Sequence, residues 1–304
     1  MRLPTARARI ESWQAKAPAP PVVRMLESLF HMAKFIPELQ DIAKRVRRDI
    51  VTMITAAKSG HPGGSLSAVE IVVELYFNHM RIDPANPKWA DRDRFILSKG
   101  HAAPVLYSVM AERGYADTPK DKLNTLRQFG SVFQGHPDMR FIPSLEASTG
   151  SLGQGLSLGL GMALGSRLDA RPSRFFVMLG DGEIQEGQIW EAAMAAAFHK
   201  ADSLVAIVDY NRIQLDGFVS DIMEIAPVVD KWRSFGWHTV EIDGHDFAAI
   251  EAALAEAAAT KGKPTCIVAH TVKGKGVSFM ENNPKFHGVA PTQDELKLAL
   301  QELN

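Results

Sequence analysis

The residues best suited to chemistry follow two apolar segments near the middle of the chain. Residues 175–179 lead into a Gly-Asp-Gly turn that contains Asp181, and residues 204–208 lead to Asn211. Each segment is typical of a buried strand, and a helix-like stretch separates them, so together they predict a right-handed βαβ unit. Ligands of parallel α/β sheets bind beyond the carboxyl ends of the strands. Asp181 and Asn211 are therefore expected to face one ligand.

A magnesium-bound diphosphate suits this pair of side chains. Magnesium takes oxygen ligands in octahedral geometry, usually one or two carboxylates with phosphate and water oxygens. Asp181 would supply a carboxylate, Asn211 its amide oxygen, and the Ile213 backbone a carbonyl. Gly180 and Gly182 would let the backbone approach the phosphates closely. A Gly-Asp-Gly turn after a strand is common by itself, so the prediction depends on its pairing with Asn211.

Four histidines occupy loops, each beside glycine or proline: His61, His101, His136 and His287. A lone histidine is more often structural, but four of the ten in one local setting favour a function. Histidine can donate a hydrogen bond, transfer a proton near neutral pH, or help to bind phosphate when charged. Their spacing does not match a zinc site. Acid–base and hydrogen-bonding roles around a polyhydroxylated or phosphorylated substrate are the favoured interpretation.

The composition excludes several classes of protein. The 304 residues are 46% hydrophobic and 23% charged, as in a globular protein with a substantial core. A net charge of −1 argues against nucleic-acid binding, and no apolar run approaches the ~18 residues of a membrane span. The single cysteine, Cys266, lies in an apolar run and is expected to be buried. Residues 1–17 lack a hydrophobic signal core, so a cytoplasmic location is expected.

Alternating strands and helices predict an α/β fold: a doubly wound, mainly parallel sheet with helices on both faces. Residues 1–37 are expected to form a partly flexible extension, and residues 38–304 one domain. Further strands are expected at 94–97, 238–242 and 265–269. Helices are expected at 38–57, 118–129, 156–168 and 248–260. Two more are expected to begin at capping boxes: one at Ser67–Glu70, which runs to residue 78, and a terminal helix at Thr292–Glu295. The regularly spaced glycines of 156–168 predict a helix that packs closely against another element.

Several motifs together resemble the amino-terminal half of transketolase, in the thiamine diphosphate enzyme superfamily. The Gly-Asp-Gly turn with Asn211 matches the cofactor signature of that superfamily. Four further segments are close to transketolase motifs: Ser59-Gly60-His61-Pro62-Gly63, Leu97-Ser98-Lys99-Gly100-His101, Gly135-His136-Pro137 and Thr149-Gly150-Ser151-Leu152-Gly153-Gln154-Gly155. The resemblance extends from about Glu38 to the end of the chain, and the combination of motifs is highly specific.

The resemblance implies a thiamine diphosphate-binding fold and assigns roles to particular residues. Asp181, Asn211 and the Ile213 carbonyl would bind Mg²⁺, with Ca²⁺ or Mn²⁺ as possible substitutes. The cofactor's diphosphate would contact His101, Gly182, Asn211 and His287, and its two rings would contact Gly150, Ser151 and Leu152. His61 and His136 would hydrogen-bond the donor sugar, with His101 and His287 close by for proton transfer. Glu186 corresponds to a position near the family's subunit interface.

The resemblance also implies a partner. Full-length transketolases carry a second domain, which binds the cofactor's pyrimidine and supplies the activating glutamate, and a third domain beyond it. Here the resemblance ends at Asn304, after the diphosphate domain, and residues 64–67 look more like those of transketolases split into two subunits. The chain is therefore expected to need a C-terminal transketolase subunit, in an α2β2 assembly. Together they would transfer a two-carbon ketol unit from a ketose phosphate to an aldose phosphate.

Two alternatives remain open from the sequence. One is the α subunit of a thiamine-dependent 2-oxoacid dehydrogenase, which also carries Gly-Asp-Gly and Asn. That class would lack the settings of His61, His136 and His287. The other is a non-catalytic protein that retains affinity for thiamine diphosphate.

Overall fold

The computed structural model describes residues 21–304 apart from residue 216, with side chains from residue 36 onward. The chain divides into two compact units, residues 1–38 and 39–304. Helix α2 spans Pro21–Ala57, so it begins well before the expected residue 38. Pro37 lies inside this helix and does not end it. The part of the expected extension at residues 1–20 lies outside the described residues.

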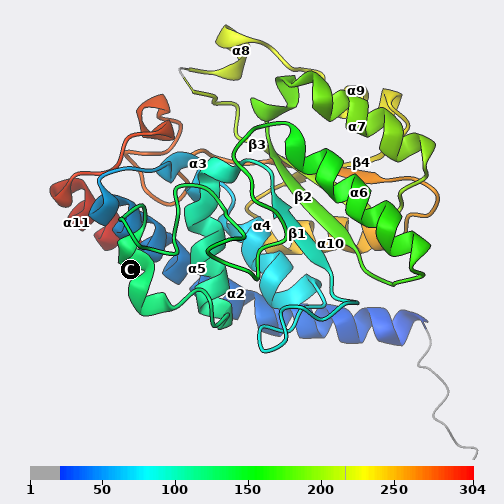
Figure 1. Ribbon diagram of the computed structural model, residues 1–304, viewed down its shortest axis with the longest axis horizontal. Coiled ribbons are helices and arrows are strands. Elements are labelled where there is room, and N and C mark those ends of the chain that lie inside the picture. Colours follow the sequence, from blue (N-terminus) through cyan, green and yellow to red (C-terminus); the bar gives the residue numbers. More distant parts are fainter. Residues whose placement is uncertain (1–20, 216) are drawn as a thin grey trace, which may run out of the picture. The chain divides into compact units, whose positions relative to one another are not determined.

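The described residues contain a five-stranded, all-parallel sheet with the strand order β1-β2-β3-β5-β4 (Figure 1). The strands are β1 (Arg94–Leu97), β2 (Phe175–Gly180), β3 (Leu204–Tyr210), β4 (His238–Asp243) and β5 (Thr265–His270). The predicted doubly wound α/β fold is confirmed. Gly180 of β2 pairs with Asp209 of β3, so the segments that carry Asp181 and Asn211 leave the sheet side by side.

Strands β2, β3 and β5 are buried almost throughout, whereas the edge strand β4 is only partly buried. Alternate residues of each strand point to opposite faces of the sheet, so helices on both faces are needed to cover them. On one face, Val177, Ala206 and Val208 belong to an apolar cluster with residues of α6 (Gln154–Leu168), α7 (Gly187–Phe198) and α9 (Val228–Ser234). On the other face, the Phe176 ring contacts His79, the last residue of the π-helical segment η2 (Leu75–His79), which continues α4 (Val69–Glu74). Helix α10 (Phe247–Ala259) contacts both β4 and α4.

The remaining described elements are short helices in the connections, apart from α5 and α11. They are α3 (Pro62–Leu66), η3 (Gly100–Ala102), α5 (Ala103–Arg113), η4 (Lys120–Thr125), η5 (Glu183–Gln185), α8 (Val219–Ile222), η6 (Pro284–His287) and α11 (Gln293–Glu302). The capping box predicted for α11 is confirmed, since the Thr292 hydroxyl accepts from the Glu295 N–H and the Glu295 carboxylate accepts from the Thr292 N–H.

Two local predictions are wrong. The helix expected at 118–129 is only the 3₁₀ turn η4, which ends at Thr125 because Leu126 (ψ 129°) and then Arg127 (φ 60°) leave the helical region. Helix α4 does not begin at a Ser67–Glu70 capping box. The Ser67 hydroxyl instead donates to Asp209, and Glu70 forms a buried ion pair with Arg47.

The close packing predicted for residues 156–168 is confirmed at Gly159 of α6. A Cβ at this position would lie 2.5 Å from Val177 Cγ2 of β2, a distance that real Cβ atoms do not reach. Gly161 and Gly165 have open space at the corresponding place. Only the first of these three glycines is therefore required by contact with the sheet.

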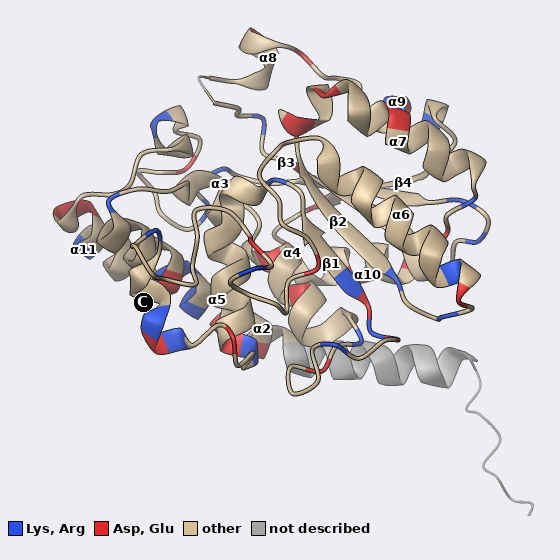
Figure 2. Cartoon of the chain, viewed as in Figure 1, with Lys and Arg blue, Asp and Glu red and all other residues tan. Residues whose placement is uncertain are grey.

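The charge distribution, the burial of the cysteine and the character of the helices agree with what the composition indicated. Acidic and basic residues are interspersed along the chain (Figure 2). Cys266 is fully buried, as predicted. None of the described helices has the length and apolar character needed to cross a membrane.

Candidate active site

A cavity of about 320 Å³ opens at the carboxyl ends of β2 and β3. It is lined by loop residues that are far apart in the sequence: His61, Gly64, Lys99, His101, Gly150, Leu152, Gly180, Asp181, Gly182, Glu183, Asn211, Ile213, Gln214, Leu215, Lys273 and His287. All three predicted magnesium ligands and three of the four loop histidines are among them. Ser151 and Glu186 are exposed and do not line this cavity.

Asp181 places a buried carboxylate at the end of β2. Its Oδ1 accepts from the Gly182 N–H at 2.7 Å, and its Oδ2 accepts from the Arg212 N–H. Burial, together with the neighbouring charge of Asp209, raises the pKa of Asp181 to about 7. A divalent cation beside this carboxylate would favour its ionised form.

The amide of Asn211 has a defined orientation. Its Nδ2 donates to Asp209 Oδ2 at 2.9 Å, and its Oδ1 accepts from the Ile213 N–H at 3.2 Å. Because a carboxylate only accepts, the nitrogen must face Asp209 and the oxygen must face away. The Ile213 carbonyl accepts from Lys273 Nζ at 2.6 Å, so this oxygen already faces a cation.

These three oxygen groups have the chemistry that Mg²⁺ requires. Only one of them is a carboxylate. The described part of the chain has no group of three His, Cys, Asp or Glu side chains suited to a metal, so a site here has to use other oxygens as well. An amide and a backbone carbonyl complete the donor set, and the residues present therefore fit the metal.

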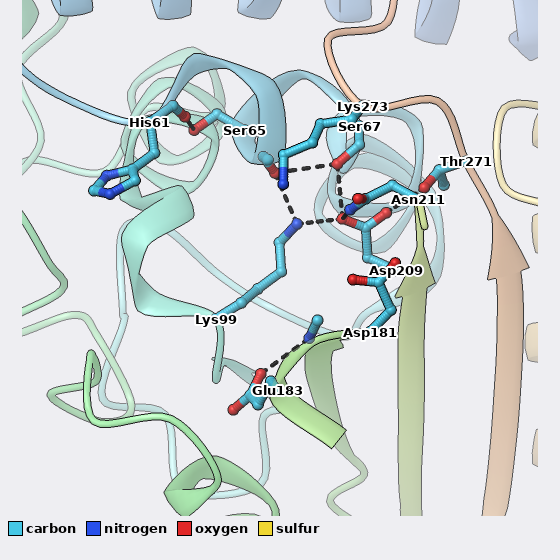
Figure 3. Close-up of polar contacts among 12 residues, drawn as sticks. His61, Ser65, Ser67, Lys99, Asp181, Glu183, Asp209, Asn211, Thr271 and Lys273 are labelled. Carbon is cyan, nitrogen blue, oxygen red and sulfur yellow. Dashed lines mark hydrogen bonds and ion pairs between the residues drawn. The ribbon is translucent and has the colours of Figure 1, made fainter. Parts of the chain in front are cut away.

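Lys99, which lines the cavity, forms a buried ion pair with Asp209 (Figure 3). Lys99 Nζ also donates to the Gly64 carbonyl at 2.7 Å, and Asp209 also accepts from the hydroxyls of Ser67 and Thr271. Burial alone would raise the pKa of Asp209, but Lys99 and these donors lower it below its usual range. Asp209 is thus ionised, which in turn fixes the orientation of Asn211. Sequence reasoning missed both partners.

The loop histidines gather around one point. The ring centroids of His61 and His101 are 5.3 Å apart, those of His61 and His287 are 5.6 Å apart, and those of His101 and His287 are 5.3 Å apart. The His136 ring does not line the cavity, but its centroid lies 6.3 Å from that of His61. A Cβ on Gly150 would lie 2.9 Å from the His136 ring, so His136 packs directly behind a residue of the cavity wall.

These histidines are neutral at pH 7. Burial lowers the pKa of His61 to about 4, and the charges of Arg127 and Lys273 contribute. Burial and Lys273 lower the pKa of His287 to about 3, and burial and Lys99 lower that of His101 well below its ordinary value. The rings are therefore suited to donating and accepting hydrogen bonds rather than to binding phosphate as cations.

Lys273 is a cavity residue that sequence reasoning missed. Its ammonium lies 2.8 Å from His287 Nδ1 as well as 2.6 Å from the Ile213 carbonyl. An ammonium only donates, so His287 accepts at Nδ1 and carries its proton at Nε2. The glycine- and lysine-rich composition of residues 273–276 was the available signal, but the sequence did not indicate the contact partners.

Glu183 joins three segments that surround the cavity. Its carboxylate accepts from the Gly153 N–H at 3.0 Å, from the Gly180 N–H at 2.9 Å, and from the Ser98 hydroxyl. Burial raises the pKa of Glu183, and these donors oppose that shift. The end of β2, the start of α6 and the residue after β1 are thereby held together. This residue was also missed.

Gln214 faces the position of Gly182. A Cβ on Gly182 would lie 2.9 Å from Gln214 Cβ, so a larger residue there would require Gln214 to move. The Nε2 atom of Gln214 is buried and has no hydrogen-bond partner within the described structure. A donor left unsatisfied in a cavity wall suits an anionic ligand such as a diphosphate.

The family of the chain follows from comparison with known proteins. Residues 39–304 match the family model described as "Transketolase, thiamine diphosphate binding domain". The chain belongs to the transketolase family. The resemblance inferred from the sequence motifs is confirmed.

Two relatives are matched over almost their whole length by most of this chain. A 6-deoxy-6-sulfo-D-fructose transketolase subunit from Clostridium sp. (strain MSTE9) is 44% identical, and the match covers 88% of this chain and 96% of the relative. An apulose-4-phosphate transketolase subunit from Phocaeicola vulgatus is 40% identical, with 88% and 93% covered. The solved transketolase from Leishmania mexicana is 32% identical with a TM-score of 0.82, and the match covers 87% of this chain but 41% of that chain.

Proposed function

We propose that this transketolase chain is the diphosphate-binding subunit of a two-subunit transketolase. It would act with a partner to move a two-carbon ketol unit from a ketose phosphate to an aldose phosphate. The observation that carries the proposal is the meeting of Asp181, Asn211 and the Ile213 carbonyl with three neutral histidines in one cavity. The family match supports thiamine diphosphate as the cofactor, and the oxygen donors support Mg²⁺ as its metal.

When bound, thiamine diphosphate supplies the carbon nucleophile for breaking and re-forming the C–C bond. The chain itself would hold the diphosphate through Gly182, His101 and His287 and through the metal on Asp181 and Asn211. Gly150 and Leu152 would line the ring end of the cofactor. Ser151 belongs to the same loop, but its exposure suits a contact made in the assembled enzyme.

The histidines would handle the sugar and its protons. His61 and His136 would hydrogen-bond the donor's hydroxyl groups near the bond that breaks. His287 presents a ring N–H at Nε2 because its Nδ1 accepts from Lys273. Since the rings are neutral at pH 7, each can accept a proton or donate a hydrogen bond without first losing a proton to solvent.

The partner would carry the pyrimidine-binding domain and the glutamate that activates the cofactor. Support comes from the two relatives that are matched over 96% and 93% of their lengths, because both are named as subunits. We propose an assembly with two copies of both chains, in which Glu186 lies near the interface between them. A cytoplasmic location and the division into an extension, residues 1–37, and a domain, residues 38–304, stay predictions.

We propose that the donor substrate is a ketose other than the common pentose phosphates. The two relatives are named for 6-deoxy-6-sulfo-D-fructose and for apulose 4-phosphate, not for a common pentose phosphate. A panel of ketose donors that includes both of these and xylulose 5-phosphate would identify the substrate.

The decisive experiment assays ketol transfer by the chain alone, by its candidate partner alone, and by the mixture. Activity is expected only in the mixture, with added thiamine diphosphate and Mg²⁺. Robust turnover by the isolated chain would refute the subunit proposal. Cofactor binding without activity with any partner would favour the non-catalytic alternative. The 2-oxoacid dehydrogenase alternative is not favoured, because the family match and the named relatives are transketolases.

A further inference from the structure

The guanidinium of Arg127 lies between the two Gly-His-Pro loops of the site. Its Nη1 donates to the Ser59 hydroxyl at 2.9 Å, and its Nη2 lies 3.4 Å from His61 Nδ1. The same Nη2 contacts the Gly135 carbonyl at 3.5 Å. Ser59 and His61 belong to the first loop, and Gly135 directly precedes His136 of the second. One side chain therefore contacts both loops.

The backbone around Arg127 is arranged to hold this side chain. Arg127 adopts a left-handed φ of 60°, which is uncommon for a residue with a side chain. Its N–H donates to the Phe133 carbonyl at 2.8 Å, which closes the turn. A Cβ at Gly135 would lie 3.0 Å from Arg127 Nε, so glycine leaves room for the guanidinium to lie against the second loop.

The contact with Arg127 assigns the tautomer of His61. A guanidinium has donors and no acceptor, so the facing Nδ1 of His61 must be the unprotonated nitrogen. The positive charge of Arg127 also disfavours a proton at Nδ1 by electrostatic repulsion. Because the pKa of His61 is lowered to about 4, the ring carries one N–H at neutral pH. That N–H is at Nε2.

We propose that Arg127 is a positioning residue, which holds the two Gly-His-Pro loops at a fixed spacing and makes His61 an Nε2–H donor toward the sugar. The assignment of the sugar as ligand rests on the proposed function. The tautomer of His61 does not, because it follows from the protein's own contacts.

The first test is ¹⁵N NMR of the full chain labelled at histidine, with the His61 signals identified from His61→Asn. In the wild-type chain, His61 should show the Nε2–H tautomer. Arg127→Met should produce a mixture of tautomers, and Arg127→Lys should largely retain the original one. Arg233→Met, which alters an exposed arginine in α9, is the matched control. A wild-type Nδ1–H tautomer, or no change in Arg127→Met, would overturn the proposal.

The second test measures ketol transfer with the partner subunit. Arg127→Met should lower kcat/KM for the donor sugar about tenfold to a hundredfold, the effect of losing a hydrogen bond to a charged group, and leave cofactor affinity unchanged. Ser59→Ala removes one contact of the Arg127 guanidinium and preserves the turn at Arg127. It should therefore change the His61 tautomer population and kcat/KM for the donor sugar in the same direction as Arg127→Met, but less. This variant keeps the test valid even if Arg127→Met folds poorly. Unchanged kcat/KM in both variants would overturn the positioning role. Absence of cofactor binding in the wild-type chain would instead refute the proposed function and leave the tautomer result standing.

Discussion

The Lys99 ammonium and the Asp209 carboxylate form an ion pair in which neither side chain is more than 1% exposed. A buried ion pair is costly to break from one side, because the remaining charge has no solvent around it. Lys99→Met should therefore lower the free energy of unfolding by about 3–5 kcal/mol, as measured by denaturant titration. The exposed Lys297→Met, with a side chain that is 73% exposed, is the control and should change it little. A loss below about 1 kcal/mol in Lys99→Met would mean that the pair is not closed to water.

Asp181→Asn should weaken binding of the metal while keeping the size of the side chain. Removing the only carboxylate of the donor set should raise the Kd for Mn²⁺, used as a paramagnetic probe for Mg²⁺, by about tenfold to a hundredfold. Binding of thiamine diphosphate should weaken in parallel, because the metal links the diphosphate to the protein. The control is Asp294→Asn, at a side chain that is 90% exposed. Wild-type Mn²⁺ affinity in Asp181→Asn would contradict the metal assignment.

Two glycines of α6 make a matched pair. Gly159→Ala would place a Cβ 2.5 Å from Val177 Cγ2 and should destabilise the protein by about 1–3 kcal/mol through overpacking. Gly161→Ala meets open space and should stabilise it by up to about 1 kcal/mol, since alanine favours the helix. Thermal unfolding of both variants checks the prediction. Equal effects would show that the α6–β2 contact does not set the requirement for glycine.

The stability of the chain should fall as the pH drops from about 6.5 to about 4. His61 has an ordinary pKa of 6.5 that folding lowers to about 4, so in this range the unfolded chain binds protons that the folded chain does not. The contribution is complete above pH 6.5 and is lost as the pH falls toward the folded pKa. Denaturant titrations across this range should show a shallower decline in His61→Asn. A decline of the same slope in that variant would show that other groups dominate.

The sheet and the cavity position of Asp181 and Asn211 could be predicted because their signals are local. Each strand is a short apolar run, and Asp181 and Asn211 each follow their own run within three residues. In parallel strands that position alone places them at one edge. The loop positions of the four histidines could be predicted for a similar reason, because the glycine or proline beside each one marks a loop, and their function stays a prediction.

The supporting contacts could not be predicted, because their partners are distant in sequence. Lys99 meets Asp209 across 110 positions, and Ser98 meets Glu183 across 85. At Ser67 and Glu70 a distant partner overrides a local signal. Locally it is a good capping box, but Asp209, 142 residues away, is an ionised acceptor and takes the Ser67 hydroxyl. Charge in a buried setting outweighs the capping of a short helix.

The Glu183 carboxylate links the part of the cavity that would bind the diphosphate end of a cofactor to the part that would bind its rings. It bonds both the Gly180 N–H, beside the predicted metal ligand, and the Gly153 N–H, at the end of the loop that would meet the rings. Ordering one end should therefore lower the entropy cost of ordering the other. Binding at the two ends of one cofactor molecule would then be cooperative. The binding free energies of a thiamine fragment and a diphosphate fragment, each measured alone, would add up to less than that of intact thiamine diphosphate.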